Sequence, residues 1–366
     1  MTLNLNLLNV QYTLSNNYLS PNLRFQFEQV TATEKQLYYR LIALWAVCEG
    51  VLGGIIHGFQ LPVSGLFVGG AAIVIICMIG YFVPQKGAIL QATLMVEIFK
   101  MMLSPQSPLP AYLAVAFQGV TGELFFFNKR FYKISCVLFA AIALFESAIQ
   151  RIITMTLIYS NEFWKAMDAF INGITGQTEV TRYSYYIAGG YVLLHIVAGI
   201  AIGIFASRIP SKLNIWKKDK QFVIAVPEIH ENEIIEKHRR KKTGKHSLLI
   251  IWLILLLLFL QSSFHIGKPL LTADNILQIL VRSFLILLTW YFLLSPVLLF
   301  FLKKYLSGQR KKSQSTINEI LLLIPSTRTL IKNSWKISGE KKGIGRFNRF
   351  IKIVLINSFD DIHDEA

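Results

Sequence analysis

Polar and ionisable side chains interrupt stretches of this chain that are otherwise apolar. They are Glu49, His57, Glu97, Lys100, Gln118, Glu146 and His195. At the centre of a membrane helix an ionisable group costs roughly 2.5–3.5 kcal/mol, so such groups face the interior of a helix bundle or a watery cavity. An ammonium there would bind a carboxylate or phosphate, and carboxylates would accept hydrogen bonds from amines or hydroxyls. The set therefore predicts a binding pocket for a small solute within the membrane.

Glu97 and Lys100 lie three residues apart in the run LQATLMVEIFKMML. On a helix this spacing places them on one face, where they can neutralise each other. Glu97 would then keep Lys100 charged and aimed at a solute, or the two would form a purely structural pair between helices. His195 has the further interpretation of a packed, hydrogen-bonded histidine. Glu123 lies close to the end of its apolar run, so its side chain can be interpreted as reaching the membrane surface.

The chain lacks the motifs that would indicate catalysis. It contains no GxxxxGK[ST], HExxH, GxSxG or paired CxxC, and without the first of these it offers no P-loop for ATP. The spacing of His57, Glu97 and His195 does not require a metal. We therefore expect no catalytic residue, metal or cofactor, and uphill transport would take its energy from an ion gradient or a partner.

The elements that must position these side chains are transmembrane helices. Apolar residues make up 53% of the chain and charged residues 16%, against about 25% charged residues in soluble proteins. A helix needs about 20 apolar residues to cross a bilayer. The segments that reach or approach this length are 39–58, 65–83, 88–103, 109–127, 133–158, 184–206, 247–265 and 276–302. We predict an all-α, multi-pass membrane protein with about eight transmembrane helices.

The distribution of basic residues between the loops predicts the orientation. Arg24, Lys35 and Arg40 precede the first apolar segment, whereas the loop QLPVS that follows it has no basic residue. The alternation continues along the chain. Because short loops rich in Lys and Arg remain in the cytoplasm, we expect both termini to be cytoplasmic and the protein to lie in the inner (cytoplasmic) membrane of the cell.

These patterns divide the chain into successive parts. They are a polar leader (1–36), a six-helix, solute-binding membrane bundle (37–206), a basic cytoplasmic linker (207–246), a two-helix membrane region (247–302) and a basic, helical cytoplasmic tail (303–366). The linker cluster EKHRRKKTGKH lies close to the bilayer, so we interpret it as an anchor that contacts anionic lipid. We do not expect a nucleic-acid partner.

Local patterns predict how some helices begin and pack. Gly199 and Gly203 form a GxxxG spacing, which lets another helix approach closely. In the tail, Thr316 and Glu319 have the spacing of a capping box at a helix N-terminus. The cysteines all fall in apolar runs, and we interpret them as buried small hydrophobic side chains. The tail also carries an amphipathic stripe, typical of a helix on a membrane or a partner: Phe347, Phe350, Ile351, Val354 and Leu355.

Two stretches resemble the substrate-binding (S) component of energy-coupling factor transporters. They are CEGVLGGIIHGFQLPVSGLFVGG and KGAILQATLMVEIFKMMLSPQSPLPAYLAVAFQGVTGE, and the resemblance covers residues 35–206. It implies a six-helix component that binds a vitamin or similar micronutrient from outside. It also implies partners, namely a transmembrane coupling (T) component and two cytoplasmic ATPases that energise uptake.

The tail is similar in manner to the coupling helices of the T component. In that component, arginines beside small residues enter grooves of the ATPases, and LIPSTRTLIKNSWKISGEKKGIGRFNRFIK has such pairs at Thr327-Arg328 and Gly345-Arg346. The resemblance implies partner-coupling roles for Arg328, Arg346 and Arg349. The chain departs from the pattern because the Ala-Arg-Ser or Ala-Arg-Gly triplet is missing and only two apolar segments precede the tail.

Two other classes of function remain open from the sequence. The buried carboxylates would suit a membrane-embedded enzyme that acts on a lipid or isoprenoid, although the apolar segments contain no DxxD-type cluster. Alternatively, the chain would be a scaffold whose basic tail recruits a partner, with a purely structural polar core. A solute-binding transport subunit is the interpretation that uses the buried charges and the tail together.

Overall fold

The described part of the chain is entirely helical. The computed structural model describes residues 21–52, 64–83, 85–104, 107–128, 131–175, 182–222, 281, 284–286 and 288–359. Across these ranges the chain forms α-helices joined by short 3-10 and π turns, with no strand. The predicted all-α class is therefore confirmed for this part of the chain.

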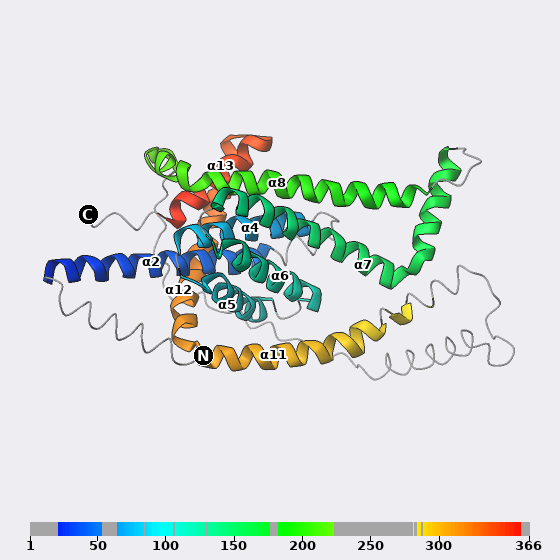
Figure 1. Ribbon diagram of the computed structural model, residues 1–366, viewed down its shortest axis with the longest axis horizontal. Coiled ribbons are helices and arrows are strands. Elements are labelled where there is room, and N and C mark those ends of the chain that lie inside the picture. Colours follow the sequence, from blue (N-terminus) through cyan, green and yellow to red (C-terminus); the bar gives the residue numbers. More distant parts are fainter. Residues whose placement is uncertain are drawn as a thin grey trace.

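Helices from the N-terminal and C-terminal parts of the sequence lie side by side (Figure 1). The first part forms α2 (Pro21–Val47), the π-turn η1 (Cys48–Leu52), α4 (Ser64–Phe82), α5 (Ala88–Leu103), α6 (Leu109–Phe126), α7 (Tyr132–Thr175), α8 (Tyr183–Lys217) and the 3-10 turn η3 (Lys220–Phe222). The second forms the π-turn η5 (Trp290–Leu294), α11 (Ser295–Lys312), α12 (Gln314–Ile337), the 3-10 turn η6 (Ser338–Glu340) and α13 (Gly343–Ser358).

Apolar helices long enough to cross a membrane support the membrane prediction. Within the described residues, the qualifying stretches are Gly65–Phe82, Leu109–Phe126, Tyr132–Leu157 and Tyr183–Leu213. Among the other expected segments, 88–103 forms α5, which is shorter at 16 residues. Segment 39–58 begins within α2, 276–302 is described only in part, and 247–265 lies outside the described residues.

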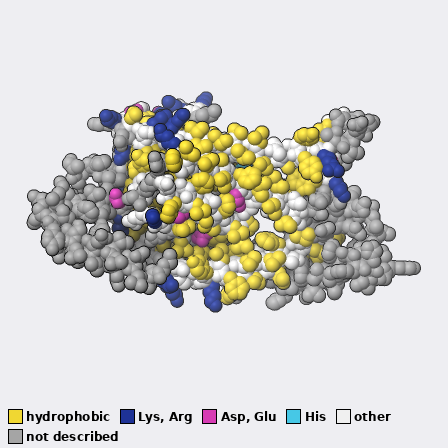
Figure 2. Space-filling view, viewed as in Figure 1, with side chains coloured by type: hydrophobic (Ala, Val, Ile, Leu, Met, Phe, Trp, Pro, Cys, Tyr) yellow, Lys and Arg dark blue, Asp and Glu magenta, His cyan; other side chains and the backbone are white. Residues whose placement is uncertain are grey.

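The bundle is apolar on its outside and carries polar groups inside. Soluble proteins rarely expose continuous apolar patches of more than a few hundred Å². Here large apolar side chains are exposed in repeated positions on α6, α7 and α8, namely Leu113, Val120, Leu124, Ile134, Leu138, Ile142, Phe145, Leu193, Val197 and Ile200. In Figure 2, hydrophobic side chains cover the middle of the molecule and most Lys and Arg side chains lie toward its periphery. This surface is suited to lipid.

Helix α5 lies inside the bundle, where it contacts α2, α4, α6, α11 and η1. Its packing against α6 is close because a Cβ added to Gly119 would lie only 2.0 Å from Oγ1 of Thr93. The Thr93 hydroxyl donates a hydrogen bond to the Ile89 carbonyl one turn earlier, so this polar group stays satisfied at the contact. Gly119 on α6 therefore allows α5 to pack closely against α6.

Helices α7 and α8 form an antiparallel pair, and the GxxxG prediction is confirmed there. A Cβ on Gly203 would lie 2.6 Å from the Val137 Cα, and one on Gly199 would lie 2.6 Å from the Ala140 carbonyl oxygen. The two backbones therefore approach at these glycines. Cys136, on the same face of α7, is buried and unpaired, as are the other two cysteines.

Both helices of this pair extend beyond the apolar segments that predicted them. Helix α7 ends at Thr175 and α8 at Lys217, and α7 bends near its far end (Figure 1). The Trp164 indole N–H donates to the Thr156 hydroxyl at 3.0 Å, although eight residues span about 12 Å in a straight helix. The bend brings the end of α7 to the start of α8, where the Asp168 carboxylate accepts a hydrogen bond from the Ser184 backbone N–H at 2.6 Å.

The C-terminal helices pack onto the bundle. Lys35 on α2 forms an ion pair of 3.1 Å with Glu319 on α12, and the hydrogen bond to Glu319 raises the pKa of Lys35. Helix α12 begins at Gln314, with Ser313 as its N-cap residue. The predicted capping box at Thr316 and Glu319 is therefore wrong, because both residues lie within the helix.

Helix α13 packs against the C-terminal end of α8. The Lys217 ammonium donates to the Phe359 carbonyl at 2.7 Å, and the Asn357 amide donates to the Phe222 carbonyl at 2.8 Å. The rings of Phe82 and Phe359 lie 4.9 Å apart, so α4 also meets the end of α13. Val354 and Leu355 of the predicted apolar stripe are buried in the core, so the stripe is used in part for packing within the chain.

Candidate functional site

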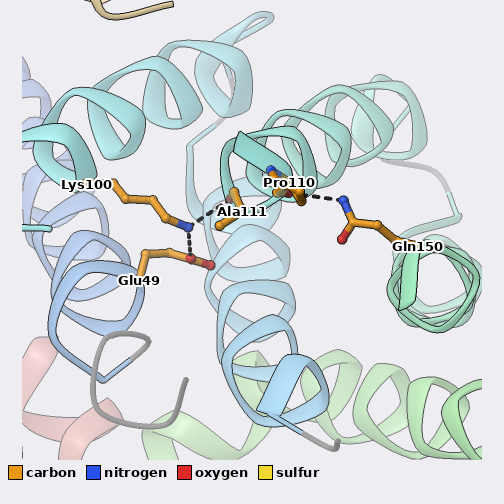
Figure 3. A network of polar contacts seen from close by, with 5 residues as sticks. All are labelled: Glu49, Lys100, Pro110, Ala111 and Gln150. Atoms are coloured by element: carbon orange, nitrogen blue, oxygen red, sulfur yellow. Dashed lines mark hydrogen bonds and ion pairs between the residues drawn. The ribbon is translucent and has the colours of Figure 1, made fainter. Parts of the chain in front are cut away.

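A buried ion pair links two helices of the bundle. The ammonium nitrogen of Lys100 lies 2.8 Å from a carboxylate oxygen of Glu49, and the two side chains are only 5% and 6% exposed. The same ammonium donates a hydrogen bond to the Ala111 carbonyl at 2.9 Å. Figure 3 shows Lys100 between these two acceptors. The pair therefore joins α5 to η1 and to the first turn of α6.

Glu49 is carried by a π-turn. After Val47 the α-helical winding of α2 widens into η1, which begins at Cys48. Such π-turns are rare and often occur at functional sites, because they re-aim side chains that a regular helix would direct elsewhere. Gly50 in this turn faces the end of α5, where an added Cβ would lie 3.1 Å from the Leu103 Cβ. The small residue allows α5 to approach the carboxylate.

Lys100 lies in the last turn of α5, where the helix dipole favours a cation. Its acceptor on α6 is a carbonyl in a turn that begins Leu109-Pro110-Ala111. The neighbouring Pro110 carbonyl accepts a hydrogen bond of 3.1 Å from the Gln150 amide on α7. The first turn of α6 is thus bound from both sides (Figure 3).

The ammonium keeps capacity for a further contact. It has three N–H donors, and its acceptors within the described residues are Glu49 and Ala111. The ring centroid of Tyr112 lies 5.8 Å from the nitrogen, within the range of a cation–π interaction. A solute carboxylate or phosphate that reached this nitrogen would find a donor available.

Glu97 is not the partner that the sequence suggested for Lys100. Its side chain is buried on α5, one turn before Lys100, but among the described residues the ion pair of Lys100 is formed with Glu49. The spacing of three residues placed the charges on one face correctly, yet a carboxylate from another helix takes the close position. Glu97 therefore remains a second buried acceptor beside the pair.

Several buried polar atoms in the bundle have no hydrogen-bond partner among the described residues. They are Trp45 Nε1, Tyr112 Oη, Gln118 Oε1 and Glu146 Oε2, on α2, α6 and α7. A buried polar atom left without a partner costs about 1–3 kcal/mol, so each such atom in a folded protein calls for an explanation such as a bound water or ligand. Two of them, on Gln118 and Glu146, belong to the residues predicted from the sequence.

The two predicted histidines have different outcomes. His195 is buried on α8, and its Nδ1 lies 2.9 Å from the Tyr191 carbonyl. Because a carbonyl can only accept, Nδ1 carries the hydrogen. The ring also packs on that of Tyr191, with centroids 4.3 Å apart, which agrees with a packed, hydrogen-bonded histidine. His57 lies outside the described residues.

Glu123 has a role that sequence reasoning missed. Its carboxylate accepts hydrogen bonds from the backbone N–H groups of Gly87 at 2.6 Å and Ile89 at 3.1 Å. These are donors that the first turn of α5 cannot satisfy itself. Gly87 has a φ of +82°, which glycine adopts readily. In the sequence, the only signal for this cap was Gly87 itself, a glycine directly before the apolar run of α5.

The three arginines of the tail have different surroundings. Arg346 lies over the Trp335 ring, 4.2 Å from its centroid, and Arg349 forms an ion pair with Glu340. Both therefore stabilise the turn between α12 and α13. Arg328 is exposed on α12. Their predicted coupling roles remain predictions, and Arg328 is the one that the described contacts leave most accessible.

Cavities lie elsewhere in the described part of the molecule. One of about 30 Å³ lies beside Glu123, and one of about 320 Å³ lies between α8 and α13. The linings of these two cavities do not include Glu49 or Lys100. No group of three His, Cys, Asp or Glu side chains that could hold a metal ion occurs within the described residues.

The site is thus a buried, compensated cation with a further buried carboxylate, Glu97, one turn away on the same helix. In comparisons with known proteins, no family model, no curated protein and no solved structure matches the chain.

Proposed function

We propose that this protein is a membrane transport subunit that binds a small charged solute at the Glu49–Lys100 pair. The observation that carries the proposal is the ammonium of Lys100, buried in an apolar bundle and held by one carboxylate and one backbone carbonyl. Ionisable residues at membrane depth are rare and mark functional sites, among them substrate and ion pathways. A purely structural link between helices would not need a charge on either side.

The chemistry of binding follows from an exchange of partners. Without solute, Glu49 compensates Lys100. A carboxylate or phosphate on the solute takes the place of Glu49, so the ammonium stays compensated throughout. Glu49, Glu97 and Glu146 then accept hydrogen bonds from amine or hydroxyl groups of the same solute. The solute class that fits is therefore small and carries both an acidic group and hydrogen-bond donors, as many vitamins do.

The site lies nearer one end of the bundle. Lys100 is in the last turn of α5, whereas the first turn of that helix is at the end where α12 and α13 pack, as the contact of Phe82 with Phe359 indicates. With the tail in the cytoplasm, the solute enters from the outer side. The cytoplasmic helices then dock to partner ATPases of the energy-coupling factor type, with exposed Arg328 as the coupling residue.

The test uses the purified full-length protein in neutral detergent. The unfolding temperature is measured with each water-soluble vitamin in turn, for wild type, Lys100→Met and the control Glu319→Gln. A ligand present at 100 times its Kd stabilises by about 2.7 kcal/mol, which gives a clear shift.

We expect at least one vitamin to raise the unfolding temperature of wild type and control but not of Lys100→Met. If no vitamin does so, or if the shift survives in Lys100→Met, the proposed site is wrong.

A further inference from the structure

A groove between α8 and α13 has the composition of a lipid-binding site. It encloses about 320 Å³, the lower end of the range for small-molecule sites, about 300–1,000 Å³. Its polar lining comes from both helices and comprises Arg208, Lys212, Trp216, Asn348 and Lys352. The described lining includes no acidic side chain.

The cations of this groove line the same cavity, and its described lining holds no acidic side chain to compensate them. Arg208 and Lys212 are four residues apart on α8, so they share a helix face, and like charges at this spacing destabilise a helix slightly. Lys352 approaches from α13, with its nitrogen 5.4 Å from the Trp216 ring centroid. An anion between the two helices would relieve the repulsion, and Asn348 can add an amide donor to it.

The other wall of the groove is apolar and continues along α8. Ala201, Ile204 and Phe205 line the cavity. Toward the middle of the helix, Val197 and Ile200 are 57% and 39% exposed. The cations lie in the last turns of the apolar stretch that ends at Leu213, where a membrane helix meets the headgroup region. The groove therefore offers positive charge at headgroup depth and an apolar track at chain depth.

We propose that this groove binds an anionic glycerophospholipid. The lipid phosphate lies among Arg208, Lys212 and Lys352, and one acyl chain follows Ile204 and Ile200 along α8. The apolar track favours a lipid over free phosphate, which would use only the cations. Basic pockets beside transmembrane helices bind anionic headgroups by this combination. The lipid would thereby hold α13, and with it the tail, against the bundle.

The experiment measures retention of phosphatidylglycerol and phosphatidylcholine by native mass spectrometry of the full-length protein in neutral detergent. The variant is Arg208→Gln/Lys352→Gln. Its control, Lys311→Gln/Lys312→Gln, removes the same charge from exposed positions at the end of α11. Unfolding temperatures without added lipid check that each variant is folded.

We expect wild type and control to retain phosphatidylglycerol over phosphatidylcholine. The variant should bind phosphatidylglycerol roughly thirtyfold more weakly, since each of the two basic residues near the membrane surface contributes about 1 kcal/mol. Equal retention of both lipids by wild type, or equal affinity in variant and control, would overturn the proposal.

Two further arms separate a lipid from a phosphate ion and guard against a variant that does not fold. Ile204→Asn leaves the cations in place. It should weaken the binding of phosphatidylglycerol but not that of inorganic phosphate. Inorganic phosphate, added to wild type in large excess, should displace little of the lipid. If phosphate displaces the lipid fully and Ile204→Asn binds it normally, the groove is an anion site without a lipid chain.

Discussion

The Glu123 carboxylate caps the N-terminus of α5 through the backbone N–H of Gly87, 2.6 Å away. Helix α6 carries Glu123 and runs antiparallel to α5, and at the other end of these two helices Lys100 of α5 donates to the carbonyl of Ala111 in α6. Each helix therefore contributes one charged side chain that binds the backbone of the other. These contacts fix the position of α5 along α6, and with it the depth of Lys100 in the bundle.

Removal of the Glu123 cap should lower the stability of the protein without removing the ion pair. We expect Glu123→Ala to cost about 0.5–2 kcal/mol, the usual range for a lost N-cap. Glu123→Gln should retain part of the stability, because its carbonyl oxygen still accepts. The unfolding temperature in detergent measures both, with Glu34→Gln on α2 as an exposed control. A Glu123→Ala protein as stable as the control would show that the cap is dispensable.

The ion pair can be separated from the solute site by a double-mutant cycle. Lys100→Met leaves Glu49 buried without compensation, and Glu49→Gln does the same to Lys100, so each single variant should lose about 3–5 kcal/mol. The double variant should recover most of this loss, because no isolated charge remains. Unfolding temperatures of the four proteins give the coupling.

Solute binding should not recover in the double variant, since the cation that binds the solute is gone. A double variant that is stable and still binds would assign the pair a structural role alone. A double variant as unstable as the single variants would contradict the free-energy cost that we assign to an isolated buried charge.

The sequence predicted helices well where lipid contact governs composition. The apolar runs located α4, α6 and the membrane parts of α7 and α8. They could not predict that α7 continues to Thr175, because hydropathy reports contact with lipid, not helix length. Beyond the apolar run, helical structure depends on tertiary contacts such as that between Asp168 and Ser184, which no local pattern reveals.

The candidate site was predictable in its members more than in its pairing. The free-energy cost of an ionisable group at membrane depth correctly predicted that Glu49, Glu97 and Lys100 are buried. Spacing along one helix suggested Glu97 as the partner, but Glu49 is 51 residues from Lys100 in sequence. Its position depends on a π-turn that composition does not show. Long-range pairing therefore required the packing of α2 against α5.

The glycines of α8 provide a matched test of helix packing. Gly203→Ala places a Cβ against Val137 and Cys136 of α7, so we expect separation of the two helices and a fall in unfolding temperature. Gly190, on the same helix, has open space around it. Gly190→Ala should be neutral or slightly stabilising, since alanine is favoured over glycine in a helix by about 1 kcal/mol. Equal effects would mean that the close approach does not determine stability.

The coupling proposal is tested at Arg328. Affinity purification of the tagged protein from native membranes in mild detergent should recover ATPase subunits with wild type. Arg328→Glu should lose them, because an exposed cation on α12 would meet an acidic groove of the ATPase. Lys332, one turn further along the same helix, is also exposed. Lys332→Glu makes the same charge change and should retain more of the partner. Arg346→Glu should instead lower the stability of the tail, since Arg346 packs on Trp335. If no ATPase is recovered even with wild type, the coupling proposal is wrong, and the buried charges belong to a gradient-driven carrier, an enzyme or a purely structural core.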